Sequence, residues 1–234
     1  MEIIEKTKEK IVFVEAFDIS LANAIRRSVG EIPTLAIDEA DIYKNDSVLY
    51  DEVIAHRLGL VPLKNQKLKK DQTVEMKLKA KSKGRVVEVL SGQLGEEVAY
   101  PDMPIVVLSE GQELELVARA RQGFGKDHSK FSPGMIYYKH LPKIKISKDG
   151  EKQSELAEIY PKVFEYDGRL KVKDVIFCDL DVDDAEKYLG VEISFGDELI
   201  IFIESWGQID AKDVFIESCK ALKDNLSEVL KAIK

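Results

Sequence analysis

The end of the chain, DAKDVFIESCKALKDNLSEVLKAIK (residues 210–234), carries its clearest structural signal. Its apolar side chains recur at intervals of four and three residues, which is the period of a helix with an a/d seam. Asp210 stands where an N-cap residue would accept the first backbone amides. The stretch therefore predicts a terminal helix with one apolar seam, formed by Phe215, Cys219, Leu222, Leu226, Val229 and Ile233.

An apolar seam of this length can be covered in two ways. The helix can pack on a sheet of its own chain, or it can pair with a second protein. Two β-rich runs, 191–195 and 198–205, precede the helix, and the Gly196-Asp197 pair between them is typical of a hairpin turn. These residues alone leave both explanations open.

The rest of the chain mixes strand-like and helical patterns, which indicates an α+β fold. A helix is expected after Asp18 or Ser20, with Leu21, Ile25 and Val29 on one face, and it should end at Gly30 and Pro33. A second short helix is expected over 51–58 and a helical turn over 183–189. Strands are expected over 11–17, 35–43, 73–80, 85–90, 105–108, 113–120, 143–146 and 169–178.

Composition excludes several classes of protein. The 234 residues allow one large domain or two small ones. No apolar run approaches the ~18 residues of a transmembrane helix, and the charged N-terminal segment is unlike a signal peptide, so we expect a cytoplasmic protein. Two Cys and three scattered His match neither a disulfide framework nor a compact metal site. The net charge of −8 argues against a free-standing DNA-binding protein.

The charge is distributed unevenly. Residues 153–234 hold 19 acidic and 10 basic side chains, whereas residues 1–152 are nearly balanced. Within the first part, the run from Lys64 to Arg85 holds eight Lys and one Arg against Asp71 and Glu75. This run indicates either a solvated strand face or a patch for nucleic acid or an acidic partner.

Two short segments invite a chemical interpretation. The residues Gly123-Phe124-Gly125-Lys126 resemble a phosphate loop, but a Walker loop needs a glycine where Ala120 stands and a Ser or Thr where Asp127 stands. His128 could act as an acid or base, yet no nucleophile or cofactor loop accompanies it. The segment 178–184 is best explained as an acidic turn, because a single thiolate cannot hold an iron–sulfur cluster.

Three motifs together resemble the alpha-like subunits of RNA polymerase. The first is NAIRR (residues 23–27), followed by Ile32-Pro33 and Ala36-Ile37. The second is DEVIAHRLGLVPL (residues 51–63), and the third is the loop GKDHSKFSP (residues 125–133). The last two are similar to motifs of the archaeal and eukaryotic branch. The chain is thus similar to the archaeal alpha-like family that is designated D, the counterpart of the bacterial alpha N-terminal region and of the third-largest subunit of eukaryotic polymerase II.

The resemblance implies a fold and a function. It implies a dimerisation domain built from residues 1–42 and 191–234, an insert domain over 43–149 and a ferredoxin-like segment over 150–190. The chain would be a non-catalytic assembly subunit of DNA-directed RNA polymerase. It would pair with the small alpha-like subunit L, contact the large subunits (chiefly the second largest) and other small subunits, and reach DNA only through the assembled enzyme.

The resemblance also implies two groups of binding residues. Residues that would contact L are Phe17, Leu21, Ile25, Phe215, Leu222, Leu226, Val229 and Ile233. Residues that would dock the large subunits are Arg26, Arg27, His56, Arg57, Lys126, His128, Lys130 and Phe131. No catalytic residue and no metal ligand is expected in this chain.

One departure from the family concerns iron. Many members bind an iron–sulfur cluster through cysteines in the ferredoxin-like segment. In this chain Tyr160-Pro161 stands where Cys-Pro would be expected, and Asp181 and Asp184 replace two further cysteines, which leaves Cys178. We therefore expect no cluster. The alternatives to the assembly subunit are a stand-alone enzyme that uses the 123–131 loop and a nucleic-acid-binding module that uses Lys64–Arg85.

Overall fold

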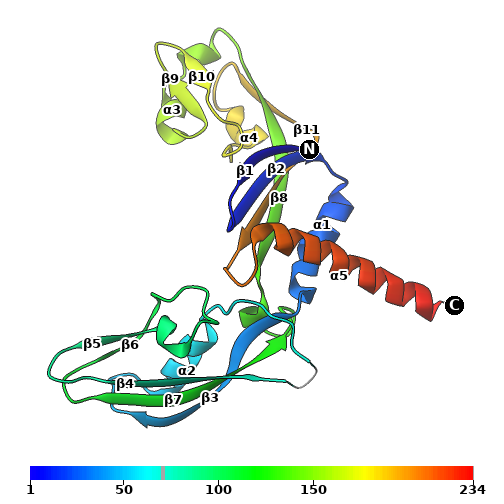
Figure 1. The fold of residues 1–234 in the computed structure, drawn as a ribbon. Coiled ribbons are helices and arrows are strands. Elements are labelled where there is room, and N and C mark those ends of the chain that lie inside the picture. Colours follow the sequence, from blue (N-terminus) through cyan, green and yellow to red (C-terminus); the bar gives the residue numbers. More distant parts are fainter. Residues whose placement is uncertain (70–71, 234) are drawn as a thin grey trace. The chain divides into compact units, whose positions relative to one another are not determined.

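The computed structural model of the chain describes residues 1–69 and 72–233 (Figure 1). They form two compact units. Unit 1 comprises Met1–Lys6, Val12–Ala22 and Tyr137–Phe202, and unit 2 comprises Thr7–Ile11, Asn23–Ile136 and the described chain from Ile203 onward. The first ten elements are β1 (Glu2–Lys6), β2 (Lys10–Ala16), α1 (Ile19–Ser28), η1 (Val29–Glu31), β3 (Thr34–Asn45), α2 (Asp51–Gly59), β4 (Val74–Lys81), β5 (Val87–Leu90), η2 (Ser91–Leu94) and β6 (Pro104–Leu108). The others are β7 (Glu113–Gly123), η3 (Ser129–Phe131), β8 (Gly134–Ile146), η4 (Gly150–Lys152), α3 (Glu155–Ile159), β9 (Phe164–Tyr166), β10 (Leu170–Val172), α4 (Val182–Ala185), β11 (Val191–Ser205) and α5 (Ala211–Ala232).

The strand β11 replaces the hairpin expected near residue 196. It runs without interruption from Val191 to Ser205 in a four-stranded sheet with the order β1-β2-β11-β8. Gly196 has no left-handed φ, which a tight hairpin turn would require, and its carbonyl lies 3.1 Å from Nδ1 of His140 on β8. The hairpin prediction was wrong because β11 has a neighbouring strand on each side, and a sequence does not reveal these neighbours.

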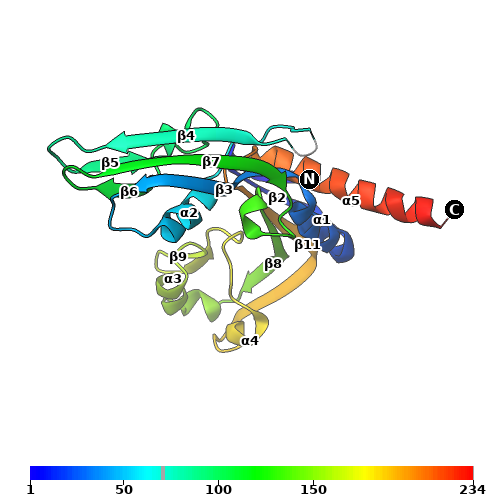
Figure 2. The same cartoon turned by 90° about the horizontal axis from the view of Figure 1, so that it is seen from below.

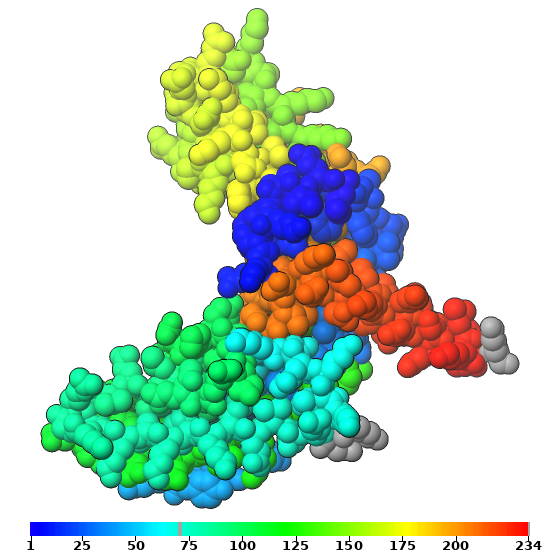
Figure 3. All heavy atoms as spheres, viewed as in Figure 1, coloured from blue at the N-terminus to red at the C-terminus, as the bar shows by residue number. Residues whose placement is uncertain are grey.

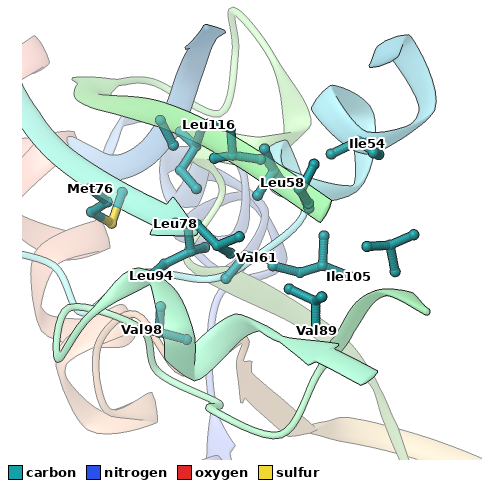
Figure 4. Packing of buried hydrophobic residues seen from close by; sticks show 14 of the residues in the cluster. Ile54, Leu58, Val61, Met76, Leu78, Val89, Leu94, Val98, Ile105 and Leu116 are labelled. Carbon is teal, nitrogen blue, oxygen red and sulfur yellow. The ribbon is translucent and has the colours of Figure 1, made fainter. Parts of the chain in front are cut away.

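Unit 2 is built around a three-stranded antiparallel sheet with the order β3-β7-β4, and α2 packs against β3 on one face of it (Figure 2). Burial alternates along β4 and β7, so that each strand has a core face and a solvent face. The core face meets Ile54 and Leu58 of α2, and these side chains converge with those of Leu78, Ile105 and Leu116 (Figure 4). The α+β fold expected from the sequence is confirmed.

The solvent face of this sheet explains part of the lysine run between Lys64 and Arg85. On β4, Lys79 pairs with Glu115 at 2.6 Å and Lys81 pairs with Glu113 at 3.3 Å across the ladder to β7. These pairs are solvated cross-strand contacts, which favours the solvated-face interpretation of this part of the run. Lys70 and Asp71, which also belong to the run, lie outside the described residues.

The two predicted helix starts agree with the structure. Asp18 accepts hydrogen bonds from the backbone amides of Ser20 (2.9 Å) and Leu21 (3.2 Å) at the start of α1. Asp210 occupies the N-cap position of α5, as expected, but its side chain makes no capping hydrogen bond. The buried residues of α5 lie in its first turns, at Ala211, Val214 and Ser218. The helix packs against η1. The last turns of α5, red in Figure 3, stand at the surface of unit 2.

The segment between residues 150 and 190 packs with Val191 and Ile193 of β11 into a small hydrophobic cluster within unit 1. Its core contains Leu156, Phe164, Leu170 and Leu180 together with Cys178. The predicted domain limits at 42/43, 149/150 and 190/191 remain predictions, although β3 runs through the first of them. Among the described residues, no helix is both long and apolar enough to cross a bilayer.

Candidate functional site

The expected contacts to a small partner lie on α1 and α5 or directly beside them, with Phe17 before α1 and Ile233 after α5. On α5, the seam changes from half-buried at Phe215 and Leu222 to more than half exposed at Leu226, Val229 and Ile233. The adjacent Leu230 is exposed as well. Such an apolar stripe on a surface helix is typical of a protein–protein contact.

The three expected residues at the other end of the chain differ in exposure. Leu21 is exposed, Phe17 is half-buried and Ile25 is only 5% exposed in the single chain. The side chain of Ile25 is therefore already covered by its own chain, where it stabilises α1 from inside. Its direct contact with a partner stays a prediction.

The two arginines of α1 are exposed and free of acidic partners. Arg26 donates from Nε and Nη2 to Oδ1 of Asn23, at 3.2 and 2.9 Å, within the same helix. Within the described ranges 1–69 and 72–233, neither Arg26 nor Arg27 forms an ion pair. Both guanidinium groups are thus available for a carboxylate of another protein.

The loop that follows β7 (residues 124–133) is fixed to η1 by close backbone contact. Gly125 approaches Gly30 so closely that a Cβ on Gly125 would lie 3.1 Å from the Gly30 Cα. The amide of Lys126 donates to the carbonyl of Gly30 at 3.1 Å, and Nζ of Lys126 pairs with Glu31 at 2.7 Å. The hydrogen bond to Glu31 raises the pKa of Lys126. The loop therefore has a defined position beside the helix that carries the arginines.

Two residues of this loop are structural supports rather than open surface. Phe131 is 1% exposed, and Gly123 leaves room for its ring. Nζ of Lys130 pairs with Asp38 at 2.6 Å and lies 5.1 Å from the centroid of the Phe131 ring. The side chain of Phe131 packs inside the chain and holds the loop in place, and its contact with a large subunit stays a prediction.

Asp38 on β3 connects the loop to the sheet. Burial alone would raise the pKa of this carboxyl, but hydrogen bonds from Lys130 and Arg121 outweigh that effect and hold the pKa below its ordinary value. Arg121 also lies 5.1 Å above the Phe131 ring. The cluster of Asp38, Lys130, Arg121 and Phe131 is a partly buried network that fixes the end of β7 and the loop after it.

The structure brings the second and third sequence motifs together around one cavity. The cavity has a volume of about 380 Å³ and lies between β3, α2 and the loop. His56 and Leu60 line it from one motif, and His128 and Lys130 line it from the other. Nδ1 of His128 accepts a hydrogen bond from the amide of Lys130 at 3.2 Å, so this nitrogen caps η3. The shared cavity gives the two motifs a common surface.

The remaining predicted residue on α2, Arg57, has an internal contact. Its Nη2 donates to the carbonyl of Pro104 on β6 at 2.6 Å, so it ties α2 to that strand. The sequence motif did not identify the exposed apolar side chains that flank it, Tyr50, Val53 and Leu60. Spacing could have found them, since positions 53 and 60 fall on a different side of the helix from the buried Ile54 and Leu58.

The residues at the cluster positions of the family do not fit an iron–sulfur cluster. Cys178 is buried, and burial raises the pKa of its thiol. Oδ1 of Asp181 accepts from the amide of Asp184 at 2.7 Å and thereby caps α4, and Asp184 pairs with Lys187. Iron in such clusters requires several thiolates. The part of the chain that the structure describes contains no group of three His, Cys, Asp or Glu side chains placed to hold a metal ion.

Comparison with known proteins identifies the family. The family model described as the RNA polymerase Rpb3/Rpb11 dimerisation domain matches residues 12–226. A relative from Thermococcus kodakarensis, DNA-directed RNA polymerase subunit Rpo3, is 42% identical over 170 residues, which cover 68% of this chain and 66% of the relative, slightly less than two thirds of its length.

Two further relatives align over nearly the full chain. Subunit Rpo3 of Methanothermobacter thermautotrophicus is 35% identical, over 97% of this chain and 96% of the relative. DNA-directed RNA polymerase II subunit rpb3 of Dictyostelium discoideum is 29% identical, over 98% of this chain and 93% of the relative. On the extent of these matches, the chain belongs to the RNA polymerase Rpb3/Rpb11 dimerisation-domain family.

Proposed function

We propose that this chain is the alpha-like, Rpo3-type subunit of an archaeal DNA-directed RNA polymerase, the type that is also designated D. In this role it has no catalytic function of its own, and it assembles the enzyme by binding other subunits. The observation that carries the proposal is the combination of the family match over residues 12–226 with an exposed apolar seam at the end of α5. We also propose that it acts in the cytoplasm.

The first step of assembly is pairing with the small alpha-like subunit L. The second half of the α5 seam is exposed in the single chain, and so is Leu21 on α1. Fully burying one Leu, Ile or Val side chain stabilises a complex by about 1.5–3 kcal/mol. The half-exposed residues Leu226 and Val229 therefore contribute about half of that each when a partner helix covers them. We propose that residues 1–42 and 191–234 together form this pairing domain.

The second step is docking of the large subunits, chiefly the second largest, together with other small subunits. Support comes from the unpaired guanidinium groups of Arg26 and Arg27 and from the cavity lined by His56 and His128. Lys126 and Lys130 contribute to the same region through the loop that they hold. A bidentate contact from either arginine to a carboxylate would orient the two proteins.

No iron–sulfur cluster is part of this proposal. The support is the donor set, since Cys178 is the one thiol in the segment and the neighbouring carboxylates are engaged in capping and ion pairing. Broad absorption near ~400 nm with stoichiometric iron in the purified protein would contradict it.

Copurification tests the function. The chain carrying an affinity tag is expressed in an archaeal host that encodes it, and the proteins that copurify are identified by mass spectrometry. We expect the large polymerase subunits and a small alpha-like subunit in equal amounts. The variant Leu226→Glu should lose the small subunit, whereas the matched control Val86→Glu, at an exposed position next to β5 in the same unit, should retain it. Recovery of the tagged chain without polymerase subunits would contradict the proposal.

A further inference from the structure

The loop between β3 and α2 exposes an unusual amount of apolar surface. Val48 and Tyr50 are 80% and 79% exposed, and Val53 in the first turn of α2 is 40% exposed. These three side chains lie within six residues of each other, and all belong to unit 2. Tyrosine is enriched among the residues that dominate binding energies at protein interfaces, and contiguous exposed apolar side chains mark such sites.

The loop is held in one conformation by the side chain of Asn45. Its Nδ2 donates to the carbonyl of Leu49 and to Oδ1 of Asp51, both at 2.8 Å. Its Oδ1 accepts from the amide of Ser47 at 3.0 Å and from the Ser47 hydroxyl at 2.6 Å. Because the loop is ordered before binding, association with a partner does not carry the entropic cost of ordering it.

The loop is also tied to the neighbouring strand. The amide of Asp46 donates to the carbonyl of Glu113 on β7 at 2.9 Å, and the amide of Glu113 donates to Oδ2 of Asp46 at 3.2 Å. This reciprocal pair continues the β3–β7 ladder by one residue. Tyr50 and Val48 are thus presented by a rigid support.

The rim of this surface is acidic. Asp46, Asp51 and Glu52 flank the apolar side chains, and the segment 46–53 contains no basic residue. Among the described residues, the cation that contacts these carboxylates is Lys44, at 3.5 Å from Asp46, and Lys44 is shared with Glu113 at 3.1 Å. The excess of negative charge around Tyr50 selects a partner with positive charge.

We propose that residues 46–53 form a docking surface for a basic segment of another polymerase subunit. The aliphatic stems and apolar neighbours of its Lys or Arg side chains cover Val48, Tyr50 and Val53, and its charged ends pair with Asp46, Asp51 and Glu52. An Arg placed over the Tyr50 ring adds a cation–π contact. The inference rests on the proposed function, because it names the kind of partner that this face of the polymerase subunit takes.

Carbodiimide cross-linking of the purified polymerase tests the contact, since this reagent joins a carboxylate directly to a lysine amine that touches it. We expect Asp51 or Glu52 to be linked to a lysine of another subunit, within a segment rich in Lys and Arg. Iodination should modify Tyr50 in the isolated chain at least tenfold faster than in the assembled polymerase. Tyr43, near the end of β3, is also exposed in the isolated chain. Its iodination rate in the isolated chain is the reference to which the rates of Tyr50 are normalised.

Variants assembled into the polymerase provide the second arm. Tyr50→Ala and Glu52→Lys should each increase, by about tenfold, the dissociation at raised salt of the subunit that cross-linking identifies. Both side chains are exposed, so the fold should be unchanged by circular dichroism. Val86→Ala and Glu88→Lys, at exposed positions on or next to β5, are the matched controls and should leave subunit retention unchanged.

Two results would overturn the inference. One is a polymerase that contains the chain but leaves Tyr50 as reactive as in the isolated chain, with no intersubunit link at Asp51 or Glu52. The other is a link to a segment in which the linked lysine is the one basic residue. Failure of the proposed function looks different, because the chain would then be absent from the purified polymerase altogether.

Discussion

The contact between Gly123 and Phe131 yields a quantitative prediction for the loop that carries the third motif. In Gly123→Ala, the new Cβ would lie 2.7 Å from Cε2 of Phe131 and 2.8 Å from Cδ2 and Cζ. Carbon atoms normally approach to about 3.5–4.0 Å. The ring cannot move away freely, because it is 1% exposed and the cationic groups of Arg121 and Lys130 each lie 5.1 Å from its centroid.

The size of the effect follows from two opposing terms. Overpacking of this kind costs about 1–3 kcal/mol. Gly123 lies in a strand without a left-handed φ, so alanine meets no backbone strain and restricts the unfolded chain, which offsets about 0.4–1 kcal/mol of that cost. We therefore expect Gly123→Ala to lower the free energy of unfolding of unit 2 by about 1–2 kcal/mol.

The assay is urea unfolding followed by the fluorescence of Trp206, the single tryptophan, which lies in unit 2. Gly59→Ala is the matched control, because its Cβ would meet its nearest atoms at 3.9 and 4.0 Å, and alanine is the better helix former. In the double variant Gly123→Ala, Phe131→Leu, the smaller side chain should recover about 1 kcal/mol relative to the sum of the single changes. The reasoning would be refuted if Gly123→Ala lowered the free energy of unfolding no more than Gly59→Ala does. It would also be refuted if the effects of Gly123→Ala and Phe131→Leu were strictly additive in the double variant.

Three further predictions concern other contacts. Asp38→Asn should lower the free energy of unfolding at pH 7 by about 1–3 kcal/mol. Because the pKa of Asp38 is lower in the folded than in the unfolded chain, the difference in stability between parent and variant should be constant above the unfolded pKa of about 3.9 and shrink as pH falls below it. Acid titrations of both proteins would reveal this. Cys178, whose thiol is buried with a raised pKa, should resist alkylation at pH 8 until the protein unfolds, and rapid labelling of the native protein in a mass-spectrometric assay would contradict its burial. The double variant Arg26→Ala, Arg27→Ala should retain the small subunit and the thermal stability of the parent. It should bind the second-largest subunit at least tenfold more weakly. Unchanged binding would argue against a role of the two arginines in docking.

The features that local sequence determines were predictable. The start of α5 after Asp210 and the capping of α1 by Asp18 depend on neighbours within a few positions, and the structure agrees with both. The motifs at 23–27, 51–63 and 125–133 identified the same family that the comparisons show. The strand expected over 73–80 likewise corresponds to β4.

The features that depend on distant neighbours were not predictable. The turn-like pair Gly196-Asp197 lies inside β11 because β2 and β8 pair with that strand from both sides. The family resemblance implied that Phe131 docks a large subunit, yet its ring is buried because Gly123, at the end of β7, makes room for it. The exposure of Tyr50 depends on the hydrogen bonds of Asn45, which arise only when the loop has folded.

The central claim is that this chain pairs through the exposed seam of α5. The most direct measurement is native mass spectrometry of the chain co-expressed with a small alpha-like subunit, at micromolar concentration, for the parent protein and for Leu222→Glu and Leu226→Glu. We predict a one-to-one heterodimer for the parent and separate chains for both variants, with the folded state of the variants confirmed by circular dichroism. Separate migration of the parent chains, or unchanged pairing by both variants, would contradict the account.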